Sequence, residues 1–386
     1  MQCQIAVIGN GAIGKAAALG LAQAGHDVVL IAPAVAAHPV MTQWDARVFA
    51  LNRGAQELLC KLKVWDALDQ QRVCAVASMR VADEGGAELL LDAYAAYHRQ
   101  MAWIVEDQNL NQALDNALRF APNLKIVNGR AASMTPDFSE MTLEDGKLLR
   151  AELWVGADGA HSWMRNQAQI GVDYRSYHQS GVVCNFACEL PHNGVAHQWF
   201  AGEQGVVALL PLPGQLVSLV WSAPQALATQ LMAESMEQIA DRLAAFCQPQ
   251  LGRLAPLPPG QARAFPLNFV AAHDVVAPRL ALVGDAAHVV HPLAGQGMNL
   301  GFGDVAALIE AVGQRESWRE CGDAMVLRRY ASARKEQVLF MQLATDGMAR
   351  LFASQLEPVK SLRNVGMQLM NRATLIKRRL IQHAMG

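Results

Sequence analysis

The spacing of apolar and polar residues predicts a strand, a helix and a second strand at the start of the chain. Residues 5–8 are an apolar run, a glycine-rich turn follows at 9–14, and small apolar residues recur at helical spacing over 16–24. Gly25 closes this predicted helix, and residues 27–31 form another strand-like run. This order is typical of a βαβ unit with parallel strands.

The same analysis predicts further helices and strands along the chain. Helices are expected at residues 52–70, 106–119 and 298–312. Strands are expected at residues 75–82, 88–91, 151–156 and 280–283. These segments extend the α/β pattern over most of the chain.

From about residue 177 to residue 221, strand patterns follow one another with turn sequences between them at 191–194, 202–205 and 213–214. This run predicts an antiparallel sheet inserted into the first domain. We therefore expect an α/β fold with a Rossmann-like domain, an inserted antiparallel β-sheet domain and a C-terminal helical region. The expected segments are 1–74, 101–176 and 271–345 for the Rossmann-like domain, 75–100 and 177–270 for the inserted domain, and 346–386 for the C-terminal helices.

Composition narrows the class of protein. Hydrophobic residues make up 52% of the 386 residues and charged residues 17%, which argues against extensive disorder. The 32 Lys and Arg balance 34 Asp and Glu, so the net charge of −2 gives no reason to expect nucleic acid as a partner. No apolar run reaches the ~18 residues that a membrane-spanning helix needs. None of the seven cysteines forms a CxxC pair. Together these features favour a cytoplasmic protein.

The turn between the first strand and helix carries the GxGxxG pattern Gly9, Gly11, Gly14. Glycine allows a tight turn and close approach to a pyrophosphate, while the helix N-terminus offers free N–H groups. Lys15 makes the turn resemble a P-loop, but Ala16 lacks the hydroxyl that would bind Mg²⁺. A dinucleotide site is the better interpretation.

One expected element of that site is missing. An acidic residue normally follows the second strand, where it binds the adenosine ribose, yet the strand here ends at Ala32. Either other groups hold the ribose or the affinity for the nucleotide is reduced.

Two further motifs place an aspartate beside a glycine after a predicted strand. The first runs from Gly156 to Ser162 around Asp158 and is followed by Arg165. The second begins at Gly284–Asp285 and continues over residues 291–304. Each carboxylate can accept hydrogen bonds from sugar-like hydroxyls, and the N–H groups of the turn at 295–298 can stabilise negative charge on a flavin ring.

These three motifs resemble those of the FAD-dependent aromatic hydroxylases related to p-hydroxybenzoate hydroxylase. Residues 291–304 are similar to the signature of the ubiquinone-biosynthesis branch of that family, and residues 45–47 and 103–107 also match it. The resemblance runs the whole length of the chain. It implies that the Rossmann-like domain binds FAD and that the inserted sheet domain binds the substrate.

The resemblance also implies site residues. Non-covalent FAD would have its phosphates and adjacent groups at Gly9, Gly11, Gly14 and Arg47. Asp158 would lie near the pyrophosphate and Asp285 would bind the ribityl chain. The isoalloxazine would be faced by Gly295, Gln296, Gly297, Met298 and Asn299.

The chemistry implied is that of a monooxygenase. NAD(P)H or another donor would reduce FAD, O₂ would form a C4a-hydroperoxyflavin, and one oxygen would be added to the ring of a polyprenylated phenol or quinol in ubiquinone biosynthesis. The catalytic loop would contain His291 and Pro292, where His291 either binds a substrate or peroxide oxygen or packs the loop. His288 and His291 have no third ligand nearby, so no metal site is expected.

Two alternatives remain for the function. The substrate could be a soluble phenolic compound, or the chain could be a non-catalytic scaffold, for which Ala32 is the support.

On the inserted sheet, some of the aromatic and apolar residues would line the substrate pocket and the rest would be ordinary core. The candidates are Trp199, Phe200, Leu210, Pro211 and Trp221.

The chain after Val359 contains six basic residues and no acidic ones. Its apolar residues fall on one helical stripe. Such a basic amphipathic helix would either make peripheral contact with the inner face of a membrane or another ubiquinone-biosynthesis protein, or pack on its own domain.

Overall fold

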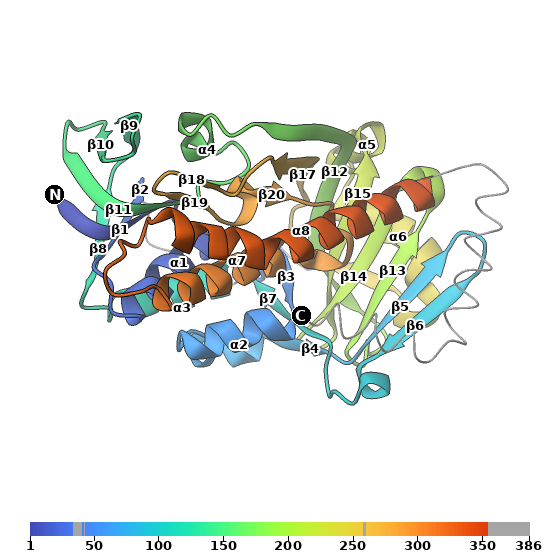
Figure 1. Cartoon of the computed structure of the whole chain (residues 1–386). Helices are drawn as coiled ribbons and strands as arrows, with labels where there is room; N and C mark the ends of the chain where they lie inside the picture. Colours follow the sequence, from blue (N-terminus) through green and yellow to red (C-terminus); the bar gives the residue numbers. More distant parts are fainter. Residues whose placement is uncertain (34–40, 42, 258–259, 354–386) are drawn as a thin grey trace.

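The computed structural model describes residues 1–33, 41, 43–257 and 260–353. In this part, two large sheets lie side by side, and the long helix α8 (Ala324–Ala353) runs from one to the other (Figure 1). Within these residues, we find no helix of the length and apolarity required to cross a bilayer. The basic segment after Val359 lies outside the described residues.

The first sheet is the Rossmann-like one. Its strand order is β18-β19-β11-β1-β2-β8, with β10 and β9 added beside β11. The strands are β1 (Gln2–Ile8), β2 (Val28–Ala32), β8 (Leu124–Asn128), β9 (Ala131–Met134), β10 (Glu140–Leu143), β11 (Leu148–Gly156), β18 (Val276–Ala277) and β19 (Leu280–Leu282). Strands β8, β2, β1, β11 and β19 are parallel. The predicted βαβ unit is confirmed.

Three helices pack on one face of this sheet, and small residues let two of them approach each other closely. They are α1 (Ala12–Gln23), α3 (Asp107–Leu118) and α7 (Gln296–Gly313). A Cβ on Gly20 of α1 would overlap the side chain of Ile309 on α7. The two helices can therefore approach closely, which brings their N-terminal ends to the same region of the domain.

The second sheet has the order β20-β17-β12-β15-β14-β13-β5-β6, with β16 beside β12. Its strands are β5 (Ser78–Asp83), β6 (Glu88–Asp92), β12 (Val172–Cys188), β13 (Val195–Phe200), β14 (Val206–Leu212), β15 (Leu216–Pro224), β16 (Leu254–Pro256), β17 (Arg263–Ala272) and β20 (His288–Val289). Strands β13, β14 and β15 form a meander, but β12 pairs with β15 and β17. A small third sheet joins β3 (Val48–Leu51), β7 (Ala102–Glu106) and β4 (Cys74–Val76).

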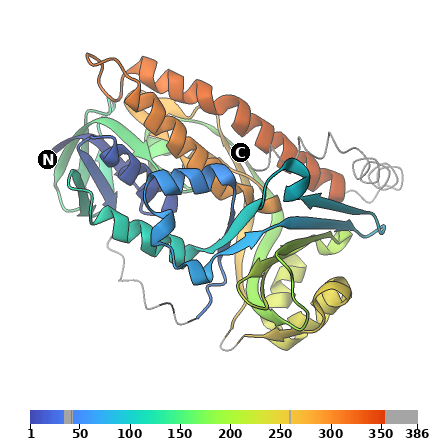
Figure 2. The same cartoon turned by 90° about the horizontal axis from the view of Figure 1, so that it is seen from below.

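Two helices of the second domain were not expected from the strand patterns. They are α5 (Gln225–Ala233) and α6 (Met236–Leu251), and they lie on one face of the sheet (Figure 2). Ser235 and Gln238 begin α6 with a reciprocal capping box. The remaining helices are α2 (Arg53–Lys61), within the first predicted helix, and the short α4 (Trp163–Gln167).

Strand alternation separates the five candidate pocket residues into two groups. Trp199 and Trp221 pack in the core that the sheet forms with α5 and α6, and Pro211 falls on that face of β14. Phe200 and Leu210 are on the opposite face, where they pack with residues outside this core. Only these two of the five face the first domain.

A buried ionic cluster attaches α8 to the first domain. One oxygen of Asp304 on α7 accepts hydrogen bonds from the Gly284 N–H (2.9 Å) and His288 Nε2 (2.6 Å), and the other from Arg334 Nε on α8 (2.7 Å). Burial alone would raise the pKa of Asp304, but His288 and Arg334 hold it below its usual range. The boundary expected at 345/346 falls inside α8, and that at 176/177 inside β12.

Candidate active site

The three glycines of the first turn have different surroundings. Gly9 has φ +113°, and a Cβ there would overlap the carbonyl oxygen of Ala157. A Cβ on Gly14 would overlap the carbonyl oxygen of Gly9. A Cβ on Gly11 would meet nothing within 4 Å. The backbone packing therefore requires Gly9 and Gly14, whereas Gly11 leaves open space in front of α1.

That open space lies at a free helix N-terminus. Gly11 is the N-cap of α1, no side chain caps the helix, and its first turn has no acidic residue. The partial positive charge of the helix end is thus available to an anion. Lys15 does not share this role, because its ammonium group donates to Asn111 (3.1 Å) and Asp115 (2.8 Å). The P-loop interpretation is therefore excluded.

The second motif links the first and third motifs. Asp158 accepts hydrogen bonds from Ser162 Oγ (2.5 Å) and the Met164 N–H (3.0 Å), so its carboxylate holds the start of α4. Arg165 is buried and donates to the carbonyl oxygens of Ala286 (2.8 Å) and Ala160 (2.9 Å). This guanidinium fixes the third motif beside the end of β11.

Asp285 lies in the turn that the Asp304 cluster fixes. Asp285 as a residue is exposed. Protein atoms nevertheless surround its carboxyl group, and the resulting loss of hydration raises the pKa of that group. His288 and Arg47 oppose that rise in pKa electrostatically. The Arg47 side chain is 60% exposed and reaches Asp107 at 3.7 Å. Both predicted ligand groups therefore remain accessible.

Helix α7 repeats the arrangement of α1. Gly295, with φ +66°, is its N-cap, and neither a capping side chain nor an acidic first-turn residue is present. A Cβ on Gly297 would meet nothing within 4 Å. The two helix ends are joined by Ile13, since a Cβ on Gly284 or Gly301 would lie 3.2 Å or 2.9 Å from its side chain.

Three neighbouring residues complete this turn. The Asn299 side chain is tied to the backbone beside it, accepting from the Asn52 N–H (2.9 Å) and donating to the Ala50 carbonyl oxygen (2.9 Å). Met298 packs against the core of the first domain, and Gln296 is half-buried. Asn299 therefore holds the turn through its side chain, which leaves the backbone of 296–298 to meet a ligand.

His291 is buried at the junction of the two domains, with 2% of its surface exposed. Its Nε2 donates to Gln179 Oε1 (3.0 Å), because that oxygen can only accept, and its ring meets Tyr177 edge to face at 4.8 Å. Nδ1 is therefore an acceptor, and it has no partner among the described residues. Burial lowers the pKa of His291 to about 4. The imidazole is thus neutral, with one free lone pair, near pH 7.

A small pocket contains His291. Its other lining residues are Gln179, Phe200, Gly202, Gly205, Val206 and Phe352. Gln179 and Phe352 carry no signal in the sequence, since their partners lie more than a hundred residues away along the chain. Pro292, half-buried, leads from His291 to the start of the turn at Gly295.

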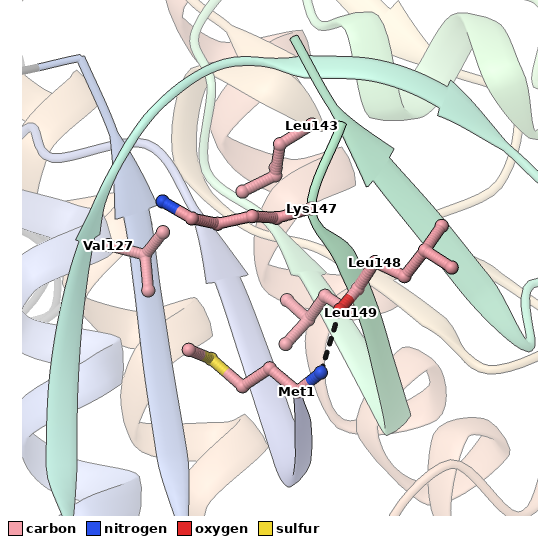
Figure 3. Close-up of a pocket in the computed structure, with 6 residues that line it drawn as sticks. All are labelled: Met1, Val127, Leu143, Lys147, Leu148 and Leu149. Atoms are coloured by element: carbon pink, nitrogen blue, oxygen red, sulfur yellow. Dashed lines mark hydrogen bonds between the residues drawn. The ribbon is translucent and has the colours of Figure 1, made fainter. Parts of the chain in front are cut away.

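A larger cavity of about 210 Å³ lies elsewhere and is lined by Met1, Val127, Leu143, Lys147, Leu148 and Leu149 (Figure 3). The Met1 amino group, which donates to the Leu148 carbonyl oxygen at 2.8 Å, marks its position at the beginning of β1. The glycine turn follows the other end of that strand, about 20 Å away at ~3.3 Å per residue. This cavity is separate from the candidate site. In the described ranges, no cluster of His, Cys, Asp and Glu suited to a metal ion is found.

The low pKa of His291 predicts a pH effect on stability. Between pH ~6.5 and ~4 the unfolded chain binds a proton that the folded chain does not, so acidification should destabilise the wild type by up to ~1.4 kcal/mol per pH unit. His291→Gln removes this loss. The free energy of unfolding of the variant minus that of the wild type should therefore increase as the pH falls. Urea unfolding across this range measures the difference, with His161→Gln at an exposed position as the control. A difference that does not change with pH would contradict the assignment.

Comparisons with known proteins identify the family of the chain. The family described as "FAD binding domain" matches residues 2–341. The chain is 37% identical to the 3-demethoxyubiquinol 3-hydroxylase of Escherichia coli, covering 99% of this chain and 98% of the relative. It is 34% identical to the ubiquinone hydroxylase UbiL of Rhodospirillum rubrum, covering 99% of this chain and 89% of the relative.

Solved structures show the same fold at lower identity. A variant of PqsL from Pseudomonas aeruginosa has a TM-score of 0.76 at 21% identity, covering 92% of this chain and 97% of that one. The p-nitrophenol 4-monooxygenase PnpA from Pseudomonas putida has a TM-score of 0.75 at 18% identity, covering 100% and 99%. The chain belongs to the FAD-dependent aromatic-ring monooxygenases, in the family of the ubiquinone-biosynthesis hydroxylases.

Proposed function

We propose that this protein hydroxylates the aromatic ring of a polyprenylated phenol or quinol on the route to ubiquinone, using FAD and O₂. The observation that carries the proposal is the pairing of two uncapped helix N-termini, each with an open glycine, beside an exposed aspartate. Those groups are Gly11 on α1, Gly297 on α7 and Asp285 between them. The full-length similarity to ubiquinone hydroxylases supports the substrate class.

The residues present fit FAD. The α1 N-terminus and Arg47 would hold its phosphates, Asp285 would accept from the ribityl hydroxyls, and the backbone N–H groups of 296–298 would face the flavin ring. Asp158 would act near the pyrophosphate by fixing the backbone beside the turn. When bound and reduced by a nicotinamide or another donor, FAD supplies the activation of O₂ for transfer of one oxygen atom.

The protein's own part is to orient the ring, hold its proton and exclude water. Nδ1 of neutral His291 is positioned to accept a hydrogen bond from a ring hydroxyl, which increases the electron density of the ring. Pro292 holds the loop between His291 and the α7 turn. Val206, Ala208 and Leu210 alternate along the face of β14 turned away from α5 and α6, and each is partly exposed. They offer an apolar wall to the substrate.

Peripheral contact with a membrane surface or another ubiquinone-biosynthesis protein is part of this proposal. Isoprenoid substrates are held in lipid, so the enzyme must reach them there. On the outer face of α8, Leu339, Leu343 and Leu351 are 51%, 66% and 39% exposed. This apolar surface supports a contact at the C-terminal end of the described chain.

Gly11→Val should prevent FAD binding while the chain still folds. The added side chain has room in the protein but fills the space in front of α1, so we expect flavin content to fall by about tenfold or more. Asp285→Ala should weaken binding through loss of a charge-assisted hydrogen bond worth ~1.5–3 kcal/mol. Absorbance of the purified proteins measures flavin content, and Gly313→Val, also in open space, is the control. Wild-type flavin content in both variants would refute the site.

Ala32→Glu should tighten FAD binding. It restores an acceptor for the ribose hydroxyls at the end of β2, and a charge-assisted hydrogen bond of ~1.5–3 kcal/mol corresponds to a roughly tenfold or larger decrease in Kd. Fluorescence titration of the apoprotein with FAD gives the two constants. Unchanged affinity would mean that another group already holds the ribose, for which exposed Asn128, paired with Ala32 across β2 and β8, is a polar candidate.

The substrate class is tested in cells that lack one ubiquinone ring hydroxylase at a time. Expression of this protein should restore ubiquinone in one such strain, as measured by mass spectrometry of the quinones. Truncation at Pro358 should reduce this restoration more than it reduces the flavin content of the purified protein. Failure in every strain, despite soluble flavin-loaded protein, would contradict the proposal and favour a soluble phenol or, if flavin were also absent, a scaffold.

A further inference from the structure

Two aromatic rings close the pocket that contains His291. Phe200, the last residue of β13, and Phe352, near the end of α8, stack with ring centroids 3.5 Å apart and an interplanar angle of 14°. Both rings line the pocket together with Val206 and the glycines at 202 and 205. The pocket lining beside α8 is therefore apolar. The ion pair of Arg175 with Asp346 on α8 is not part of this lining, although Asp346 acts electrostatically on His291.

This wall belongs to an apolar cluster separate from the main cores of the two domains. Its members include Val81, Leu89, Phe200 and Leu293, with Phe352 packed against them. Leu293 follows Pro292 directly, so the loop that carries His291 and the two aromatic rings are in one cluster. The ring of Phe352 is thus in position to act on the substrate site from the far end of α8.

The pocket is too small for a branched hydrocarbon chain in this arrangement. Its volume of about 30 Å³ has room for roughly two or three water molecules. Phe200 is fixed in a strand that pairs with β14 on one side and β5 on the other. Phe352 is carried by a helix, and rotation about its side-chain bonds opens the wall without breaking a backbone hydrogen bond. Phe352 is therefore the side of the pocket that can move.

The surface beyond Phe352 is apolar as well. Leu343, Met348 and Leu351 on the same helix are 66%, 39% and 39% exposed. An apolar chain passing between Phe352 and Phe200 would leave the pocket onto this surface, where these three apolar side chains could contact it. A hydrophilic phenol has no apolar tail and would not need such a path.

We propose that Phe352, stacked on Phe200, is a specificity-determining gate through which the isoprenoid tail of the substrate leaves the His291 pocket. This inference rests on the proposed function and names the part of the substrate that the pocket recognises. The ring stays beside the flavin, and the tail takes the place between the two phenylalanine rings. A larger ring at position 352 leaves no room for the tail but does not affect a substrate without one.

Equilibrium binding tests the gate without an electron donor. Two probes share one quinol ring, which carries a two-isoprene tail in the first and a methyl group in the second. Each is titrated into the full-length, FAD-loaded protein while flavin absorbance is followed. Phe352→Trp should weaken binding of the tailed probe about tenfold or more, an effect of ~1.4 kcal/mol, and should leave the methyl probe within about twofold. Phe352→Leu should retain the tailed probe, and Met325→Ala, at an exposed position near the start of α8 and away from the proposed path, is the control for both.

Each result is decisive. Equal weakening of both probes by Phe352→Trp would show a structural role, and no weakening would show that the tail leaves elsewhere; either overturns the gate. If both probes bind the wild type and only the gate prediction fails, the proposed function stands. If the wild type binds neither probe, the proposed function fails and the gate fails with it.

Discussion

The carboxylate of Asp304 is the point on which the site depends. It is buried, and it accepts hydrogen bonds from the turn at Gly284, from His288 and from Arg334 on α8. Burying a charged group is costly unless its partners satisfy it, and removal of one partner of a buried ion pair typically costs ~3–5 kcal/mol. This single group thus fixes the turn that presents Asp285 and attaches the helix that carries Phe352.

Beside that anchor, the chain places two similar helix N-termini, neither of which has a side-chain cap. In each helix one glycine is required by close packing, Gly14 against the backbone of Gly9 and Gly301 against the side chain of Ile13, while another glycine stands in open space. The open positions, Gly11 and Gly297, distinguish space for a ligand from space demanded by the fold. Ile13 lies between the two ends, so a change in the position of one helix is transmitted directly to the other.

The sequence predicted the parts of the site that depend on local patterns. The glycine turn, the two Asp–Gly motifs and the βαβ unit could all be predicted from the sequence, because each depends on residues that are neighbours along the chain. The helix α6 could also have been found, since Ile239, Leu243 and Cys247 recur at helical spacing after the capping residue Ser235.

Contacts between segments far apart in the chain could not be predicted from the sequence alone. The partner of His291 is Gln179, 112 residues earlier, and the stacking of Phe200 on Phe352 joins a strand to a helix more than a hundred residues later. No local pattern marks either pair. Strand alternation decided which side chains face the flavin domain, and it could be applied only once the helices on the opposite face of the sheet were known.

The origin of the new ring oxygen tests the central claim most directly. The FAD-loaded protein, with a tailed phenol bound, is reduced chemically without air and then exposed to ¹⁸O₂, and the product is analysed by mass spectrometry. A monooxygenase of this kind should place one ¹⁸O atom in a new ring hydroxyl. Reoxidation of the flavin with an unchanged ring, or a hydroxyl that carries oxygen from water, would contradict it.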